Sequence, residues 1–195
     1  LLLGDQLNIE HSWFKKTEDD VCYVQMEMRQ ETDYAPHHIQ KVVAFFGAMR
    51  NFEKEIKQKG HHTIYLTLNN PENKQDLTAN LNKLIQKHKI KYFEYQEPDE
   101  YRLDKQIADF CQSLSIPFQM VSSEHFMTSR KALSTFFEGK KQYIMEFFYR
   151  DMRKKFDLLM QDQQPEGAQW NYDKNNRKTR KRTPTIPIPY FPKSE

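Results

Sequence analysis

The sequence predicts an α/β fold in which a parallel sheet is covered by helices on both faces. Two observations lead to this prediction. Short runs rich in β-branched and aromatic residues alternate with longer segments in which apolar residues recur every three or four positions. This alternation is typical of βαβ units, whose parallel strands are buried between helices. The 195 residues include fourteen Phe and ten Tyr, which can supply a hydrophobic core.

The first part of the chain contains five expected strands and three expected helices. The first helix has the clearest ends, because Pro36 suits a first helical turn and Gly60 suits the position after a last turn. The strands are expected at residues 1–4, 21–26, 62–68, 90–95 and 117–121, and the helices at 38–59, 75–88 and 99 or 100 to 114. These elements predict a Rossmann-like domain over residues 1–125 with a five-stranded parallel sheet.

The chain changes character after residue 125. An aromatic-rich helical extension is expected over residues 126–170, with helices at 129–137 and 141–160. Its segment 143–156 interleaves aromatic and basic residues, which suits either a grip on nucleic acid or a core stripe beside a solvated face. Residues 171–195 are first basic and then Pro-rich, and we expect them to form an extended linker.

The basic run in this linker is a candidate for phosphate contacts with nucleic acid. Its cations are Arg177, Lys178, Arg180, Lys181 and Arg182. A flexible basic run can bind phosphates without sequence preference. The same run also fits a solvated linker, and the sequence leaves both interpretations open.

Several classes of protein are not indicated. No stretch approaches the roughly 20 apolar residues that a membrane-spanning helix needs, and we expect a cytoplasmic protein with no membrane partner. Cys22 and Cys111 alone cannot bind a structural zinc ion or an iron–sulfur cluster. The sequence has no Gly-rich phosphate loop, nucleophile elbow or HExxH motif, so we assign neither catalytic nor metal-binding residues.

Polar and aromatic side chains follow the first two expected strands. Gly4 permits close backbone approach, and Asp5 and Gln6 can hydrogen-bond the polar edge of a ring. The loop 27–38 then gathers Glu27, Glu31, Asp33, Tyr34, His37 and His38. Ligands of open α/β sheets bind at the carboxyl ends of strands, so the two loops predict a site for a flat polar heterocycle. Asp33 could instead cap the next helix, and Tyr34 could be a packing residue.

A series of motifs in fixed order gives the sequence a family resemblance. The motifs are GDQLN, ExxxExxYxxHH, KxxxFFxAMRNF, QEPDEYR, MEFFYRDMRKKFDLLM and QPEGAQWNYDKNNR, and they extend over nearly the whole chain. In this order they resemble the amino-terminal part of the deoxyribodipyrimidine photolyase-related proteins. That family includes the bacterial cryptochromes and (6-4) photolyases that hold an iron–sulfur cluster.

The resemblance implies a light-harvesting chromophore in the α/β domain, which is 6,7-dimethyl-8-ribityllumazine in characterised members. The matching positions are Gly4, Asp5, Glu31, Tyr34 and His37, with Glu27, Met28, Phe45 and Met49 as second-line contacts. The family's FAD and 4Fe-4S cluster belong to a carboxy-terminal helical domain, which we expect to lie outside this chain. On this basis the chain would capture light and pass the excitation to a flavin.

The expected partners follow from the same resemblance. The full-length protein would act on damaged DNA as a photolyase or sense blue light as a cryptochrome, whereas this part alone would not be catalytic. The chain would pair with its own FAD domain, and without that cover its apolar surface would promote self-association. The alternative from the residues alone is a non-enzymatic α/β module that binds a nucleotide or nucleic acid. Nucleic-acid binding would weaken steeply with salt, which distinguishes it from a buried chromophore.

Overall fold

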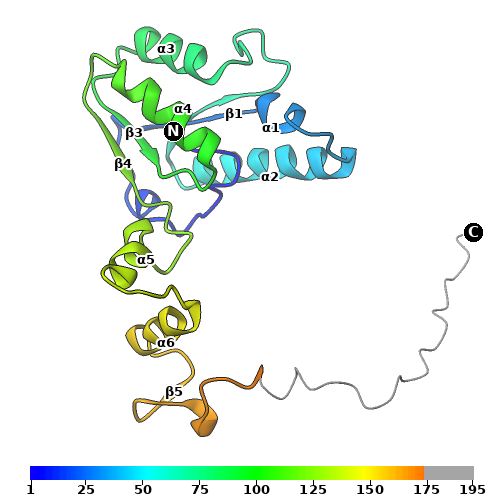
Figure 1. The fold of residues 1–195 in the computed structure, drawn as a ribbon. Coiled ribbons are helices and arrows are strands. Elements are labelled where there is room, and N and C mark those ends of the chain that lie inside the picture. The colour runs from blue at the N-terminus through cyan, green and yellow to red at the C-terminus, as the bar shows by residue number, and fades with distance from the viewer. Residues whose placement is uncertain (174–195) are drawn as a thin grey trace, which may run out of the picture. The chain divides into compact units, whose positions relative to one another are not determined.

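A computed structural model describes residues 1–173 and divides the chain into two compact units. The first unit is Leu1–Ser129 and the second begins at Arg130 (Figure 1). The Pro-rich tail and the basic run Arg177–Arg182, both expected from the sequence, lie outside the described residues. Within the described residues, no helix combines the length and apolar character needed to cross a membrane.

The first unit contains two pairs of parallel strands. β1 (Cys22–Met26) pairs with β2 (His62–Leu66), in a register that runs from Cys22 opposite His62 to Met26 opposite Leu66. β3 (Phe93–Gln96) pairs in the same sense with β4 (Phe118–Val121). The unit is therefore an α/β fold with parallel strand pairs.

The prediction of one five-stranded parallel sheet is wrong, because the strands form separate two-stranded sheets. The expected strand at residues 1–4 lies between the two pairs but makes only one backbone hydrogen bond to each. The Leu2 N–H donates to the Val24 carbonyl at 2.9 Å, and the Leu1 amine donates to the Glu94 carbonyl at 2.6 Å. A turn begins at Gly4 directly after the leucines, so the segment is too short to build the repeated bonds of a ladder.

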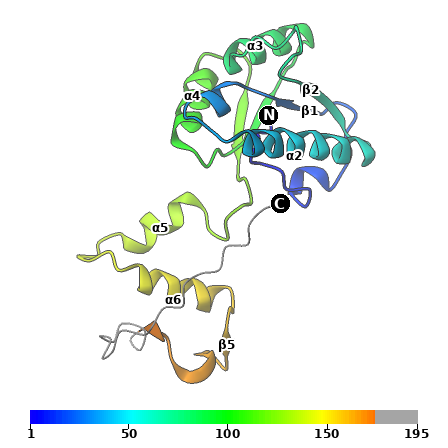
Figure 2. The same cartoon turned by 90° about the vertical axis from the view of Figure 1, so that its right-hand side faces the viewer.

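Alternation of side chains along residues 1–3 shows how the first unit is layered. Leu1 and Leu3 belong to one core cluster and Leu2 to another, as expected where successive side chains point to opposite faces. The first cluster contains residues of α3 (Leu77–Lys87) and α4 (Tyr101–Gln112), and the second contains Phe52 and Ile56 of α2 (Ile39–Gln58). Helices therefore cover both faces of the strands (Figure 2).

The start of α2 (Ile39–Gln58) differs from the expectation that Pro36 opens the helix. A separate short helix, α1 (Gln30–Asp33), precedes it, and Asp33 is the last residue of that helix. Asp33 therefore does not cap α2. His38 takes that role, since its ring nitrogen accepts the Gln40 N–H at 3.2 Å.

The end of α2 agrees with the prediction that Gly60 follows its last turn. Gly60 has φ 93°, a left-handed conformation that costs glycine little. Its N–H donates to the Lys57 carbonyl at 2.9 Å, and the His61 N–H donates to the Ile56 carbonyl at 3.3 Å. This pair of bonds is the Schellman motif, which satisfies carbonyls left unpaired at the helix end.

The second unit, as far as residue 173, contains two helices and a short hairpin. These are α5 (Arg130–Phe137), α6 (Met145–Lys155), and the antiparallel strands β5 (Met160–Gln161) and β6 (Gln164–Pro165), followed by a 3-10 turn at Glu166–Ala168. Phe148 of α6 contacts Phe136 of α5, with ring centroids 5.3 Å apart. α6 is shorter than the expected helix at 141–160, because Asp157 and Leu159 adopt left-handed backbone conformations that lead into the hairpin.

Candidate functional site

A cavity of about 290 Å³ lies where β1 and the segment 1–3 end and where three helices begin. Its wall is formed by Leu1, Leu2, Leu3, Gly4, Asp5, Met26, Met28, Gln30, Glu31, Thr32, Tyr34, His37, Lys41, Val42, Phe45, Leu77, Glu100, Arg102 and Leu103. The strand ends and the starts of α2, α3 and α4 therefore meet at this one place, the position at which open α/β folds bind ligands.

The structure brings most of the sequence-predicted site residues together in this wall. They are Gly4, Asp5, Met28, Glu31, Tyr34, His37 and Phe45. Glu27 and Met49 are not part of the wall. The apolar lining comes from the segment 1–3, from the end of β1 and from the first turns of the surrounding helices. The polar lining comes mainly from the residues between β1 and α2 and from the start of α4.

Gly4 is the point at which the cavity wall meets the packed core. A Cβ atom at this position would lie 2.3 Å from Phe45 Cζ and 3.0 Å from Met49 Sδ. Only glycine therefore lets α2 approach this closely. Met49, which is almost fully buried, supports the wall from behind.

The next residue, Asp5, is the carboxylate at the start of the loop. Desolvation by the surrounding chain raises its pKa, and the negative charges of Asp99 and Glu100 add to this effect. The sequence suggested that Gln6 would hydrogen-bond a ligand, but Gln6 is not part of the cavity wall. Its amide accepts the Leu3 N–H at 2.9 Å and donates to the Glu97 carbonyl at 3.2 Å.

Glu31 and Tyr34 share a partner that the sequence did not single out. Arg102 Nη2 lies 3.4 Å from both carboxylate oxygens of Glu31 and 3.0 Å from Glu100 Oε2. The Arg102 guanidinium also lies 5.3 Å from the centre of the Tyr34 ring, within range of a cation–π contact. The signal for Arg102 is its place in the first turn of the helix that follows β3, at the same edge as the other strand ends.

The rim of the cavity is aromatic and basic on the α2 side. Tyr34 is 63% exposed, and its ring contacts the His37 ring edge-on at 5.1 Å between centroids. His37 Nδ1 lies 3.2 Å from Lys41 Nζ. The arrangement combines an apolar interior with carboxylates, a phenol and cations at the edge, which suits a flat ring with polar substituents.

Glu27 has a structural role that the sequence did not reveal. It is fully buried, and its oxygens accept hydrogen bonds from Arg50 Nε at 2.5 Å, Tyr65 Oη at 2.9 Å and the Leu68 N–H at 2.7 Å. Burial favours the neutral acid, but these donors outweigh that effect and lower the pKa of Glu27. The carboxylate therefore ties the end of β1 to α2 and β2.

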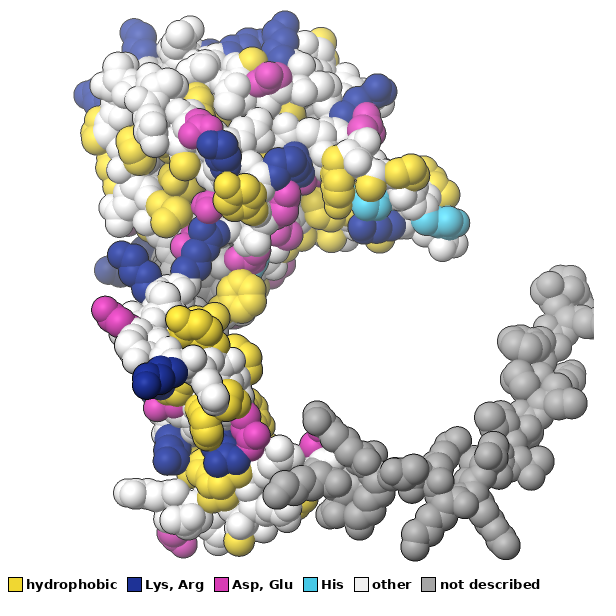
Figure 3. Space-filling model, in the orientation of Figure 1, with side chains coloured by type: hydrophobic (Ala, Val, Ile, Leu, Met, Phe, Trp, Pro, Cys, Tyr) yellow, Lys and Arg dark blue, Asp and Glu magenta, His cyan; other side chains and the backbone are white. Residues whose placement is uncertain are grey.

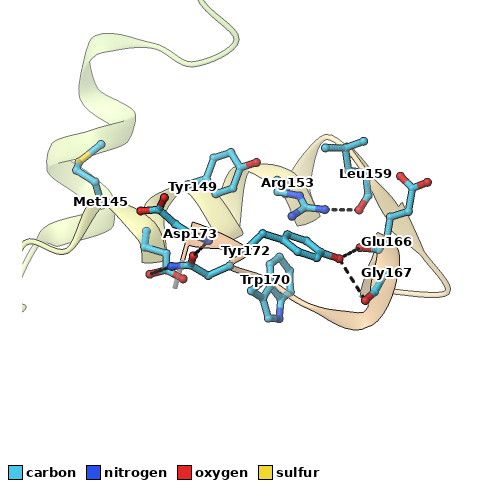
Figure 4. A pocket seen from close by; sticks show the side chains of 11 residues that line it. Met145, Tyr149, Arg153, Leu159, Glu166, Gly167, Trp170, Tyr172 and Asp173 are labelled. Atoms are coloured by element: carbon cyan, nitrogen blue, oxygen red, sulfur yellow. Dashed lines mark hydrogen bonds between the residues drawn. The ribbon is translucent and has the colours of Figure 1, made fainter. Parts of the chain in front are cut away.

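A second, broader hollow of about 770 Å³ lies in the second unit (Figure 4). It is open to solvent, and Tyr149, Trp170 and Tyr172 contribute its aromatic surface. Arg153 is buried there and donates to the carbonyls of Leu158 and Leu159.

The cations of α6 are engaged within the second unit. Arg150 pairs with Glu146, and Arg150, Arg153 and Lys154 lie 5.3–5.5 Å from the Trp170 ring. The segment 143–156 is therefore not a core stripe beside a solvated face, because Tyr143, Phe147 and Tyr149 are half exposed or more while Arg153 is buried. In the described part of the chain, no three His, Cys, Asp or Glu side chains are grouped to hold a metal ion.

Comparison with known proteins agrees with the motifs in the sequence. The family model described as "Deoxyribodipyrimidine photo-lyase-related protein" matches residues 1–195. A (6-4) photolyase of Agrobacterium fabrum is 31% identical over 180 residues, which cover 91% of this chain and 35% of the relative. An uncharacterized protein of Acanthamoeba polyphaga mimivirus is 27% identical over 150 residues, which cover 71% of this chain and 70% of the relative. This chain therefore spans about 35% of the length of the photolyase that it matches, and it belongs to the deoxyribodipyrimidine photolyase-related family.

Proposed function

We propose that this chain is the chromophore-binding part of a photolyase-like flavoprotein and that its cavity binds 6,7-dimethyl-8-ribityllumazine. The observation that supports this proposal is the convergence of Gly4, Asp5, Glu31, Tyr34 and Phe45 on one cavity at the carboxyl ends of the strands. These residues come from separate segments of the chain, and the fold places all of them in one wall.

The residues present fit such a molecule. The volume of about 290 Å³ is near the lower end of small-molecule sites, which suits one bicyclic ring system. Phe45 and the leucines of the segment 1–3 would hold the ring, while Asp5 and Glu31 would accept hydrogen bonds from its polar edge or its hydroxyls. When bound, a lumazine would supply absorption of blue light and transfer of the excitation to a flavin. The role of the chain is to bind the ring, orient it and exclude water from it.

The wider function is part of the same proposal. The Agrobacterium relative is a (6-4) photolyase, which supports light-driven DNA repair by the whole protein. A role in blue-light sensing is the other outcome that the family allows. FAD, a 4Fe-4S cluster, damaged DNA and a cytoplasmic location belong to this proposal. The FAD and the cluster would be bound by residues outside this chain.

Lumazine binding by the purified chain tests the proposal. We expect saturable binding in a fluorescence polarisation titration, with FMN and ATP as competitors that bind more weakly. Glu31→Ala and Tyr34→Ala should each weaken binding about tenfold, because each removes a polar or aromatic contact at the rim. Circular dichroism should show that both variants stay folded.

Tyr92→Ala is the matched control for Tyr34→Ala. Tyr92 is also an exposed tyrosine, but it lies outside the cavity wall and donates to Gln119. It should bind lumazine like the wild type. If the Glu31 and Tyr34 variants also bind like the wild type, the assignment of the cavity is wrong.

A further inference from the structure

Arg102 is partly exposed, yet it contacts two carboxylates and one aromatic ring of the cavity wall. It pairs with Glu31 across 71 positions of sequence and with Glu100 on the same side of the cavity. Its guanidinium also lies over the Tyr34 ring. The two residues that the proposed function uses at the rim therefore share one neighbour.

The short helix that carries Glu31 depends on such contacts. α1 has four residues, none of which is buried, and its N-terminus has no side-chain cap. A helix of this length is not stable alone, because the free-energy cost of nucleating a helix exceeds the gain from one hydrogen-bonded turn. α4 holds it at two points one turn apart, since Arg102 contacts Glu31 and Gln106 Oε1 accepts the Gln30 amide at 3.4 Å.

We propose that Arg102 is a positioning residue of the cavity, which acts on a ligand through Glu31 and Tyr34 and not by contacting an anionic group. This inference rests on the proposed function. The guanidinium already faces two carboxylates through Nη2, so its positive charge is balanced within the protein. Its loss would release Glu31 and leave the Tyr34 ring without its cation.

Substitution of Arg102 should weaken ligand binding without unfolding the protein. Because the Arg102–Glu31 pair is partly exposed, it contributes little to folding, and Arg102→Met should keep its circular dichroism spectrum. Lumazine binding should weaken about tenfold, as for a lost charge-assisted hydrogen bond. Lys105→Met is the matched control, since Lys105 lies on the same helix, pairs with Asp109 and is absent from the cavity wall.

A double-mutant cycle tests whether Arg102 acts through Glu31. If it does, Glu31→Gln combined with Arg102→Met should bind lumazine about as weakly as the weaker single variant. Independent contributions would instead multiply to about a hundredfold loss, and that result would overturn the inference. The combination of Glu31→Gln with Lys105→Met should show only the effect of Glu31→Gln.

The 5′-phosphate of the same lumazine separates positioning from direct contact. Positioning predicts that Arg102→Met weakens the binding of the lumazine and of its phosphate ester by the same factor. A selective loss of the phosphate ester would show that Arg102 contacts the anion, and it would overturn the inference while leaving the proposed function intact. A wild-type chain that binds neither compound would contradict the proposed function, and the inference would fail with it.

Discussion

At the scale of single residues, Gly4 controls how closely α2 approaches the cavity. The Phe45 ring occupies the space that a side chain at position 4 would need. Glycine is therefore required here by contact and not by an unusual backbone angle. The same contact fixes Phe45, which is itself part of the cavity wall.

Gly4→Ala should destabilise the first unit and weaken lumazine binding together. The added methyl group must displace the Phe45 ring, and overpacking of this kind costs about 1–3 kcal/mol of folding free energy. Thermal unfolding and the polarisation titration would measure the two effects. Gly47→Ala is the control on α2, because nothing lies within 4 Å of its Cβ position, and it should raise the unfolding temperature through higher helix propensity. A Gly4→Ala protein that is as stable as the wild type would contradict the packing described here.

Residues near in sequence to a strand end could be predicted as site residues, and residues distant in sequence could not. Glu31 and Tyr34 follow β1 directly, so the rule for strand ends was enough to select them. Arg102 comes from a separate strand–helix unit, and only the fold shows that it reaches Glu31. Glu27 fits the same pattern as Glu31, but its partner Arg50 and its complete burial depend on how α2 packs.

At the scale of elements, Glu27 joins three of them through one buried carboxylate. Arg50 lies on α2, Tyr65 lies on β2, and the Leu68 N–H lies just beyond β2. The native pKa of Glu27 is lower than its value in the unfolded chain. Its stabilising effect is therefore complete above the unfolded pKa, near pH 4.5, and is lost as the pH falls through the native pKa.

Glu27→Gln should reduce stability most at neutral pH. The amide cannot accept all the donors that surround the carboxylate, and a lost bond to a charged group costs about 1–3 kcal/mol. The difference from the wild type, measured by urea unfolding at several pH values, should shrink as the pH falls from the unfolded pKa, near 4.5, through the lowered native pKa of Glu27. Glu72→Gln is the control, because Glu72 forms only exposed ion pairs with Lys83 and Lys87. A difference that is constant from pH 7 to about pH 3 would show that the charge of Glu27 is unimportant.

The helices of the first unit were more predictable than its sheets. Apolar spacing located α2, α3 and α4 within a few residues of their true ends, because one buried face imposes that spacing. Sheet membership depends on hydrogen bonds between segments that are far apart in sequence. The apolar character of Leu1–Leu3 correctly indicated burial, but it could not show that the turn at Gly4 leaves too little chain for a ladder.

At the scale of the whole molecule, the two units differ in how well they cover their apolar side chains. The first unit has two buried core clusters. In the second, many large apolar side chains are exposed, and they gather around α5, α6 and the hairpin (Figure 3). They include Leu133, Tyr143, Ile144, Met145, Phe147, Tyr149, Leu158, Leu159 and Tyr172. A concentration of exposed large apolar side chains often marks an interface.

We therefore expect the chain, studied alone, to self-associate through its second unit. Sedimentation velocity at increasing concentration should show a shift to larger species. Replacing Phe147 and Leu159 with serine should raise the dissociation constant about tenfold, because each change removes apolar surface from the contact. Serine at Ile39 and Val43 is the matched control, since these are equally exposed apolar residues of α2 in the first unit, and it should leave association unchanged. An equal effect of the two double variants would show that association is not confined to the second unit. A chain that stays monomeric at all concentrations would show that the exposed surface does not bind a second copy.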